Sequence, residues 1–436
     1  MLMRVTDRVA FLRAREFARL DRTATAYLDY TGAALYPASL IRRDARRLLA
    51  AVRGNPHADS APSADSTAAT EHARALTLAF AGADPAVYDV VFTANATGAI
   101  RLVAEAFPFD RNSRLVLTAD NHNSVNGLSW PARRAKSRVT LVPLDASLRA
   151  ADPSMVLVRA PGPSLFAFPA QSNFSGVRHP LRWVGLAQER GYRVLLDAAS
   201  FAPSAPLDLT DVPADFVALS FYKIFGYPTG LGALIARRDA LAELRRRYFG
   251  GGTVDYVSMP HRLVQRKAAA AGFEDGTVSF LAMDAVCDGL RWISRLGMDA
   301  VARHSATMTG RLLDALRGCG DAVVVYGPDR AEGRGGTVAF NVRRHGRVLP
   351  YEDVEAAARA SGIALRGGCF CNPGAAAVAL GFDAARTRRC LRGDFSIPRF
   401  RDCMGGAPVG ALRASVGLAT NDQDLERLAD LVARVI

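Results

Sequence analysis

Lysine is scarce in this sequence, and its scarcity draws attention to one position. Of the 55 Lys and Arg residues only three are lysines, namely Lys136, Lys223 and Lys267. Lys136 and Lys267 lie in polar, basic surroundings, whereas Lys223 follows the apolar run 216–220. Burial lowers the pKa of an amine, and such a lysine can form a Schiff base with a carbonyl group. We therefore predict this role for Lys223; the alternative is a lysine that extends from a strand end into solvent.

Long apolar runs are also missing. No stretch of about 18 apolar residues occurs, so no membrane span is expected. Residues 1–10 carry Arg4, Asp7 and Arg8 and have no apolar core, so we interpret them as mature cytoplasmic sequence and not as a signal peptide. Six cysteines among 436 residues do not suggest a disulfide scaffold. In a cytoplasmic protein a close pair of cysteines is more typical of catalysis or metal binding.

Acidic residues are outnumbered, and the formal net charge is +13. The arginines are nevertheless scattered, with only short clusters such as Arg42–Arg43 and Arg245–Arg247. A nucleic-acid-binding protein more often has a concentrated basic stripe with exposed aromatic residues. We expect an arginine-rich solvated surface and no nucleic-acid partner; an acidic partner or substrate is the alternative.

Apolar runs alternate with amphipathic stretches over the first two thirds of the chain. Strands separated by helices indicate an α/β fold with a mostly parallel sheet that is covered on both faces. Ligands in such folds bind beyond the carboxyl ends of the strands. Residues 59–69 are small and polar, and are expected to form a loop that leads into a helix. The expected strands are 87–93, 114–118, 156–159, 193–196, 216–220 and 232–236, with helices at 98–106 and 181–190.

The pattern changes near Met283, where longer helices begin. This part of the chain is typical of a smaller α+β domain. Asn421 is expected to cap the last helix. The expected helices are 284–296, 298–317, 352–361 and 422–435, and the strands are 337–342 and 411–416. We therefore predict an N-terminal segment (1–30) that packs with the small domain, a large ligand-binding domain (31–283) and a small C-terminal domain (284–436).

Several strand ends carry polar residues that suit a flat, phosphorylated ligand. The segment 93–98 follows a strand and opens a helix, where free N–H groups and the Thr97 hydroxyl could bind phosphate. Asp197 ends a strand and could keep a pyridinium nitrogen protonated, which makes the ring a better electron sink. His122 follows a strand and could stack on the ring. The alternatives are an ordinary helix cap, a capping aspartate and an exposed loop histidine.

A second motif, Arg366–Gly374, contains Cys369 and Cys371. Its glycine and proline residues indicate a tight loop. An exposed loop cysteine near cations can ionise and act as a nucleophile. One alternative is zinc bound by these two residues with Cys390 and Cys403, although the spacing is not a familiar zinc pattern. Inert cysteines or a redox pair are further alternatives.

The sequence from Tyr27–Ala34 to Leu412–Gly417 resembles the class V aminotransferase family and, within it, the cysteine desulfurases. The likeness is strongest to the pyridoxal-phosphate (PLP) domain of molybdenum cofactor sulfurases. It depends on two long and specific stretches, Ser220–Gly232 and Arg366–Ala375. The resemblance implies the fold-type-I architecture of PLP-dependent transferases, with PLP as cofactor.

The resemblance also implies a role for single residues around that cofactor. Lys223 would form the Schiff base, Asp197 would pair with the pyridine nitrogen and His122 would stack on the ring. Asn173 and Ser200 match positions near the phenolic oxygen and the substrate, although many desulfurases carry Gln where Ser200 stands. The phosphate would be bound by Ala96, Thr97, Ser220 and Tyr222, and by Thr277 across the interface of a homodimer.

For the substrate, the resemblance implies that Arg413 binds its carboxylate and that Cys371, in preference to Cys369, carries sulfur as a persulfide. The expected reaction takes sulfur from L-cysteine, a small amino acid, gives alanine, and passes the persulfide to an acceptor. Eukaryotic molybdenum cofactor sulfurases usually carry a further C-terminal domain, whereas this sequence ends at Ile436, so the acceptor stays open. One alternative is another PLP enzyme of this fold: an aminotransferase, a β-lyase or a selenocysteine lyase. A non-catalytic zinc or scaffold protein is the other.

Overall fold

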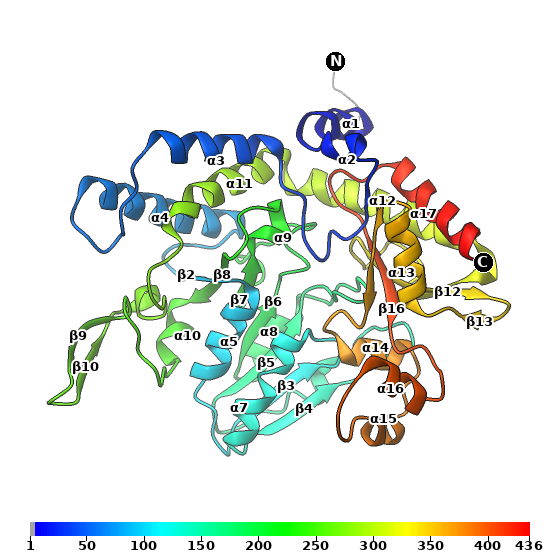
Figure 1. Cartoon of the computed structure of the whole chain (residues 1–436). Helices are drawn as coiled ribbons and strands as arrows, with labels where there is room; N and C mark the ends of the chain where they lie inside the picture. Colours follow the sequence, from blue (N-terminus) through cyan, green and yellow to red (C-terminus); the bar gives the residue numbers. More distant parts are fainter. Residues whose placement is uncertain (1–4) are drawn as a thin grey trace.

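The large sheet dominates the computed structural model, which describes residues 5–436 (Figure 1). Its strand order is β2-β8-β7-β6-β5-β3-β4. Strand β8 runs antiparallel to both of its neighbours, whereas the pairs from β7 to β4 are parallel. The predicted α/β class with a mostly parallel sheet is confirmed. The strands are β2 (Tyr88–Thr93), β3 (Arg114–Thr118), β4 (Arg138–Val142), β5 (Ser164–Pro169), β6 (Tyr192–Asp197), β7 (Phe216–Ser220) and β8 (Gly232–Arg237).

Helices cover both faces of this sheet. Successive strand residues point to opposite sides, so an apolar strand places apolar side chains on both faces. Val90 and Phe92 of β2 belong to the core on one face, and Val91 belongs to the core on the other. The first face is covered by α4 (Ala61–Phe80), α8 (Trp183–Gln188) and α11 (Met283–Leu296). The second is covered by α5 (Ala96–Ala106), α6 (Asn123–Asn126), α7 (Ser129–Arg134) and α10 (Arg238–Glu243).

The C-terminal third contains an antiparallel sheet in the order β11-β12-β16-β15, with β13 beside β12. The predicted Asn421 cap is confirmed: its side chain accepts a hydrogen bond from the Asp424 N–H, and the Asp424 carboxylate accepts one from the Asn421 N–H. The strands are β11 (Val323–Tyr326), β12 (Thr337–Arg344), β13 (Arg347–Val348), β15 (Arg366–Gly368) and β16 (Ala411–Ser415). The helices packed on them are α12 (Met298–Gly318), α13 (Tyr351–Ala360) and α17 (Asp422–Val435).

The N-terminal segment contacts this C-terminal third of the chain. Buried Arg13 donates a 2.7 Å hydrogen bond to Asp424 at the start of α17. The segment contains α1 (Val5–Glu16), α2 (Arg19–Arg22) and β1 (Ala26–Tyr27), and β1 pairs in parallel with β14 (Ile363–Ala364). Helix α3 (Ala38–Ala50) follows and packs on α11. The limits 1–30, 31–283 and 284–436 stay a prediction.

Two expectations about local structure were wrong. Residues 156–159 form no strand; they follow a short 3₁₀ helix, η1 (Pro153–Met155), and the strand at this place in the sheet is β5. The run of four residues is too short to be told from a turn, whereas β5 is buried along its whole length. Residues 61–69 are helical and belong to α4. Its small residues, such as Ser66 and Ala73, are buried and allow close packing on α11.

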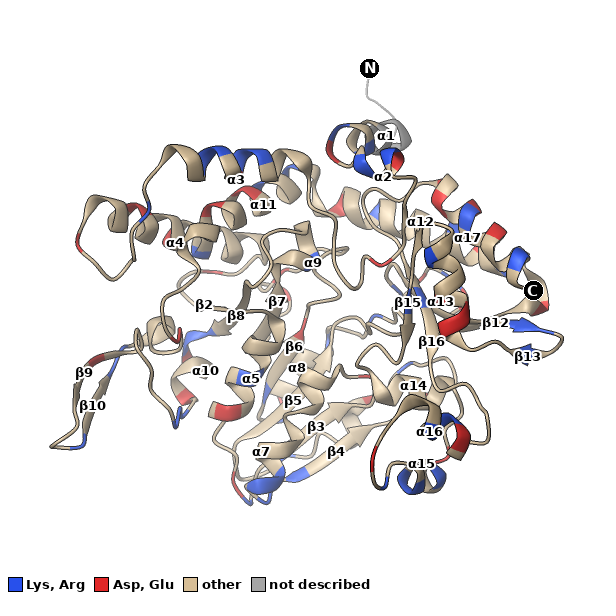
Figure 2. Cartoon of the chain, in the orientation of Figure 1, with Lys and Arg blue, Asp and Glu red and all other residues tan. Residues whose placement is uncertain are grey.

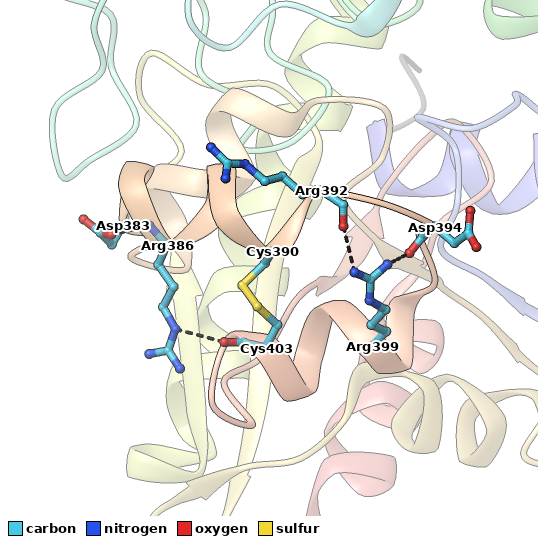
Figure 3. Close-up of a disulfide and its surroundings, with 7 residues drawn as sticks. All are labelled: Asp383, Arg386, Cys390, Arg392, Asp394, Arg399 and Cys403. Carbon is cyan, nitrogen blue, oxygen red and sulfur yellow. Dashed lines mark hydrogen bonds between the residues drawn. A yellow bond between two sulfur atoms is a disulfide. The ribbon is translucent and has the colours of Figure 1, made fainter.

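Between β15 and β16 the chain forms three short helices, α14 (Pro373–Ala379), α15 (Ala384–Cys390) and α16 (Ile397–Cys403). Cys390 and Cys403 form a disulfide that joins the ends of α15 and α16 (Figure 3). Arg386 donates a hydrogen bond to the Cys403 carbonyl, and Arg399 donates one to the Arg392 carbonyl. The sequence did not predict this disulfide. It also overturns the four-cysteine zinc site, because two of the proposed ligands are bonded to each other.

The hairpin of β9 (Val254–Ser258) and β10 (Leu263–Arg266) projects from the body of the molecule (Figure 1). It exposes apolar side chains, including Tyr256, Met259 and Leu263. Lys and Arg residues are spread over many elements (Figure 2), as the scattered arginines in the sequence predicted. Among residues 5–436, no helix is both long enough and apolar enough to cross a membrane.

Candidate active site

One cavity beyond the carboxyl ends of β5, β6 and β7 gathers most of the residues singled out in the sequence. This is where an α/β sheet is expected to bind ligands. Asn95, Ser124 and Gln171 also line it and were not predicted. Gln171 would have been found if residues 164–169 had been assigned as a strand, because it lies two residues beyond the end of that strand. The predicted residues on the cavity are Ala96, Thr97, His122, Asn173, Asp197, Ser200, Ser220, Tyr222 and Lys223.

Lys223 is placed by β7 and the short helix α9 (Phe221–Phe225) that follows it. The apolar residues on either side of Lys223 hold this helix in the core, since Phe221 and Phe225 are fully buried. Burial lowers the pKa of the Lys223 amine, and the negative charge of Asp197 partly opposes this shift. The amine is therefore more easily neutral, and so nucleophilic, than an exposed lysine. Lys223 does not extend into solvent, which removes the alternative considered for it.

Asp197 stands at the end of β6 with its side chain largely buried. Its Oδ1 accepts a 3.0 Å hydrogen bond from the Ala199 N–H. In the described part of the chain, residues 5–436, no helix lies between β6 and β7 for Asp197 to cap. A helix-capping role is therefore excluded for Asp197. A buried carboxylate facing the cavity can pair with a protonated ring nitrogen.

His122 is not an exposed loop histidine, because it lines the cavity and is partly buried. Its Nδ1 accepts a hydrogen bond from the Ser124 N–H at 3.1 Å, so this histidine also caps α6. The Ser124 hydroxyl is 2.8 Å from that of Thr97, which links the histidine to the start of α5. Burial lowers the pKa of His122, and Asp197 opposes the shift. The imidazole is consequently neutral near pH 7, as suits a ring that stacks on another.

The start of α5 forms a cradle for an anion. Asn95 caps the helix by accepting a hydrogen bond from the Gly98 N–H at 2.9 Å. The Ala96 N–H donates to the Ser220 hydroxyl at 2.8 Å, so Ser220 keeps its proton to donate to a bound group. Gly232 allows this approach, because a Cβ there would lie 2.6 Å from the Asn95 backbone. A helix N-terminus with hydroxyl groups beside it suits a phosphate.

Arg413 lies beside the cavity and is almost completely buried. It donates to the Asn173 carbonyl at 3.0 Å and to Asp29 at 2.9 Å, and its Nε–H has no partner. A guanidinium has five N–H groups, so enough donors remain to bind a carboxylate. Burial lowers the pKa of Arg413, and Asp29 opposes the shift. Arg366 also binds Asp29, at 2.6 Å. Asp29 and Arg366 belong to quoted motifs, but the sequence assigned them no role.

Cys371 is exposed on the loop between β15 and α14. Its carbonyl accepts a 2.7 Å hydrogen bond from the Asn123 N–H, which brings the loop to the His122 segment. Cys369 is partly buried and its thiol faces the Val409 carbonyl at 3.3 Å. Burial raises the pKa of Cys369, which makes it a weaker nucleophile near neutral pH. This difference favours Cys371 over Cys369.

Thr277 does not line the cavity. It is exposed, and its hydroxyl accepts a weak 3.4 Å hydrogen bond from Asn55. Its expected contact with a phosphate needs a second copy of the chain and stays a prediction.

The donor set of the cavity fits pyridoxal phosphate. It offers a lysine amine of lowered pKa, a buried carboxylate, a neutral imidazole and an anion cradle at a helix N-terminus. Each of these four groups matches one part of that cofactor: aldehyde, ring nitrogen, ring face and phosphate.

Comparison with known proteins agrees with this arrangement. The model of the aminotransferase class-V family matches residues 26–428, and the chain belongs to this family. It is 38% identical over 450 residues to the molybdenum cofactor sulfurase of Bos taurus, covering 95% of this chain. The chain spans only 50% of that relative's length.

Two solved structures share the fold. One is the apo cysteine desulfurase from Thermococcus onnurineus NA1, with a TM-score of 0.82, 23% identity and coverage of 100% of this chain and 99% of the other. The second is a mutant of the cystine C-S lyase C-DES with glycine covalently linked to its PLP cofactor, with a TM-score of 0.74, 18% identity and coverage of 97% and 98%. The predicted fold type and the assignment to PLP-dependent enzymes are confirmed.

Proposed function

We propose that this protein is a cysteine desulfurase that takes sulfur from L-cysteine, leaves alanine and holds the sulfur as a persulfide on Cys371. One observation carries the proposal. The loop with the exposed thiol of Cys371 is hydrogen-bonded to two segments that contribute residues to the cavity, through the Asn123 N–H beside His122 and through Asn173. The similarity to molybdenum cofactor sulfurases supports the same reading.

The protein's residues hold and tune the cofactor. When bound, pyridoxal phosphate supplies an electron sink that stabilises negative charge at the α-carbon of an amino acid. Asp197 would keep the ring nitrogen protonated, and His122 would stack on the ring. Lys223 would bind the aldehyde carbon. The phosphate would be held by Ala96, Thr97, Ser220 and Tyr222, and by Thr277 of a second copy of the chain.

The substrate carboxylate would be held by Arg413 and Asn173, and Ser200 would lie near the substrate and the phenolic oxygen of the cofactor. The Lys223 amine, which becomes free when the amino group of the substrate takes its place, would take the α-proton and return a proton to the product. The Cys371 thiolate attacks the sulfur of L-cysteine. The carbon–sulfur bond breaks, a sulfur–sulfur bond forms, and the carbon keeps the electron pair and takes a proton to become alanine. An acceptor with a nucleophilic group then removes the terminal sulfur.

We further propose that the protein works in the cytoplasm as a homodimer. A nucleophilic thiol such as Cys371 has to stay reduced, and the cytoplasm keeps exposed thiols reduced. The Cys390–Cys403 disulfide weighs against this location, since such bonds are rare there. Non-reducing peptide mapping of protein extracted from cells under alkylating conditions tests the location. Cys390 and Cys403 recovered as free thiols would support the cytoplasm, and a bonded pair would contradict it.

Two matched cysteine variants test the proposed function. Cys371→Ala should still bind PLP but lose alanine formation from L-cysteine by at least about 100-fold, because the sulfur has no protein nucleophile. Cys369→Ala should keep most of the activity. Alanine, sulfide and keto acids are measured in parallel. Full activity of Cys371→Ala, or pyruvate in place of alanine, would instead identify a lyase of the same fold.

A further inference from the structure

Asn372, the residue after Cys371, is completely buried although its neighbour is exposed. Its Oδ1 accepts a hydrogen bond from the Ala375 N–H at 3.2 Å and so caps α14. Its Nδ2 donates to the Asp120 carbonyl at 2.6 Å and to Asn173 Oδ1 at 2.9 Å. Both N–H groups of its amide and one lone pair of the amide oxygen are therefore used. Two of the partners belong to segments that border the cofactor cavity.

Asn173 makes a second hydrogen bond to the loop. Its Nδ2 donates to the carbonyl of Phe370, the residue before Cys371, at 2.7 Å. Because Asn372 occupies the Asn173 oxygen, the orientation of the Asn173 amide is fixed. One N–H of that amide is left without a protein acceptor, and Asn173 lines the cavity. Together with the Phe370 carbonyl, Asn372 therefore fixes Asn173 so that it offers a donor, and not an acceptor, to a group bound in the cavity.

The loop also packs too closely on this segment to move freely. A Cβ at Gly374 would lie 1.8 Å from the Ala119 carbonyl oxygen, so only glycine fits there. Asp120 is itself held by a buried 2.8 Å contact with His179. Phe370 and Cys371 both have a backbone φ of +55°, in the left-handed region that residues other than glycine rarely adopt. Such a conformation persists where surrounding contacts impose it.

We propose that Asn372 is a positioning residue that couples the Cys371 loop to the cofactor through Asn173. The proposal rests on the proposed function for the role of the thiol, but the coupling itself does not need turnover. Coupling between two sites is reciprocal. PLP therefore further restricts opening of the loop, and the closed loop tightens PLP binding by the same factor.

Hydrogen exchange of peptides spanning residues 369–376 tests the coupling, with and without PLP. In the wild-type protein PLP should slow exchange of this loop several-fold. In Asn372→Ser the serine still caps α14, but it is too short to reach Asp120 and Asn173 together, so PLP should no longer slow exchange. Asn126→Ala is the matched control. Asn126 contacts Asn121 and Asn123 but no residue of the loop, so the PLP effect should persist.

The PLP dissociation constant should rise about 10-fold in Asn372→Ser, within the usual range of couplings. In an Asn173→Ala background the Asn372→Ser change should have no further effect. Equal protection by PLP in the wild-type protein and in Asn372→Ser overturns the proposal, as does an Asn372→Ser effect that persists without Asn173. If Cys371→Ala still formed alanine while these results held, the proposed function would fail and the coupling would stand.

Discussion

At the residue scale, the lowered pKa of Lys223 has a consequence that can be measured without substrate. The folded, cofactor-free protein binds fewer protons at Lys223 than the unfolded chain does between the lowered pKa and the ordinary value of about 10.4. Unfolding therefore takes up protons in this window, and the free energy of unfolding rises as the pH increases. The burial of a neutral amine is favoured at high pH and costs stability at lower pH.

The pH prediction compares cofactor-free wild-type protein with Lys223→Met. The variant should be the more stable of the two near pH 7, and its advantage should shrink as the pH rises towards 10. Urea unfolding at several pH values measures this difference. Parallel pH profiles for the two proteins would show that the Lys223 amine is solvated in the folded state.

Arg413 supports a second prediction at this scale. Its fork of donors is shared between Asp29, Asn173 and the proposed substrate carboxylate. Lysine cannot reproduce this two-pronged geometry. Arg413→Lys should raise KM for L-cysteine about 10-fold to 100-fold, the range for losing a charged hydrogen bond, with a smaller effect on kcat. Arg366→Lys, which keeps a positive charge near Asp29, is the control. An unchanged KM in Arg413→Lys would contradict the binding of the substrate carboxylate by Arg413.

At the element scale, the disulfide joins α15 and α16 in a region with only a small apolar cluster. Cys390 and Cys403 are 13 residues apart in the sequence. Phe400, Met404 and Val409 are the other buried members of the cluster. A loop of this size gains about 3 kcal/mol from a disulfide, chiefly by restricting the unfolded chain. The crosslink therefore contributes much of what holds these helices together.

Replacing Cys390 and Cys403 together by serine should speed hydrogen exchange in residues 384–404. The PLP spectrum and alanine formation should change little, because neither cysteine lines the cavity. Hydrogen exchange with mass spectrometry reads the first effect, and a standard assay reads the second. Exchange that is the same with and without the disulfide would mean that packing alone orders the region.

The sequence predicted the elements whose pattern is strong and local. Strands such as β7 and β8 are continuous apolar runs, and the Asn421 cap is a short-range signal. The assignment at 156–159 was wrong because four apolar residues carry too little information. The first part of α4 was read as a loop because its buried residues, Ser63, Ser66 and Ala69, are small, and their burial depends on α11, more than 200 positions later.

The site was predictable where residues follow strands. Lys223 and Asp197 stand at strand ends that meet at one edge of the sheet, so a pattern along the chain sufficed to bring them together. Asn372 and Asp29 were missed because their roles depend on partners 199 to 384 positions away in the sequence. Only the folded chain brings such partners together.

At the scale of the whole molecule, two observations support a dimer. The hairpin of β9 and β10 exposes several large apolar side chains, and an isolated two-stranded hairpin is marginally stable on its own. Thr277, expected to contact the phosphate, does not line the cavity of its own chain. Sedimentation should give twice the mass of one chain; a monomer at micromolar concentration would contradict the proposal.

Mixing two impaired variants tests whether each site is built from both chains of the dimer. Lys223→Ala and Thr277→Ala should each have impaired PLP binding or activity alone. In a mixed dimer, one site combines the intact Lys223 of one chain with the intact Thr277 of the other, so activity should return. Without recovery in mixed dimers that are shown to form, Thr277 acts within its own chain or not at all.

The central claim is a covalent bond between Lys223 and pyridoxal phosphate, and borohydride reduction followed by peptide mass spectrometry tests it most directly. Reduction of protein loaded with PLP should leave a phosphopyridoxyl group on the peptide that contains Lys223. The peptides with Lys136 and Lys267 should stay unmodified. An unmodified Lys223 peptide after loading and reduction would contradict the account.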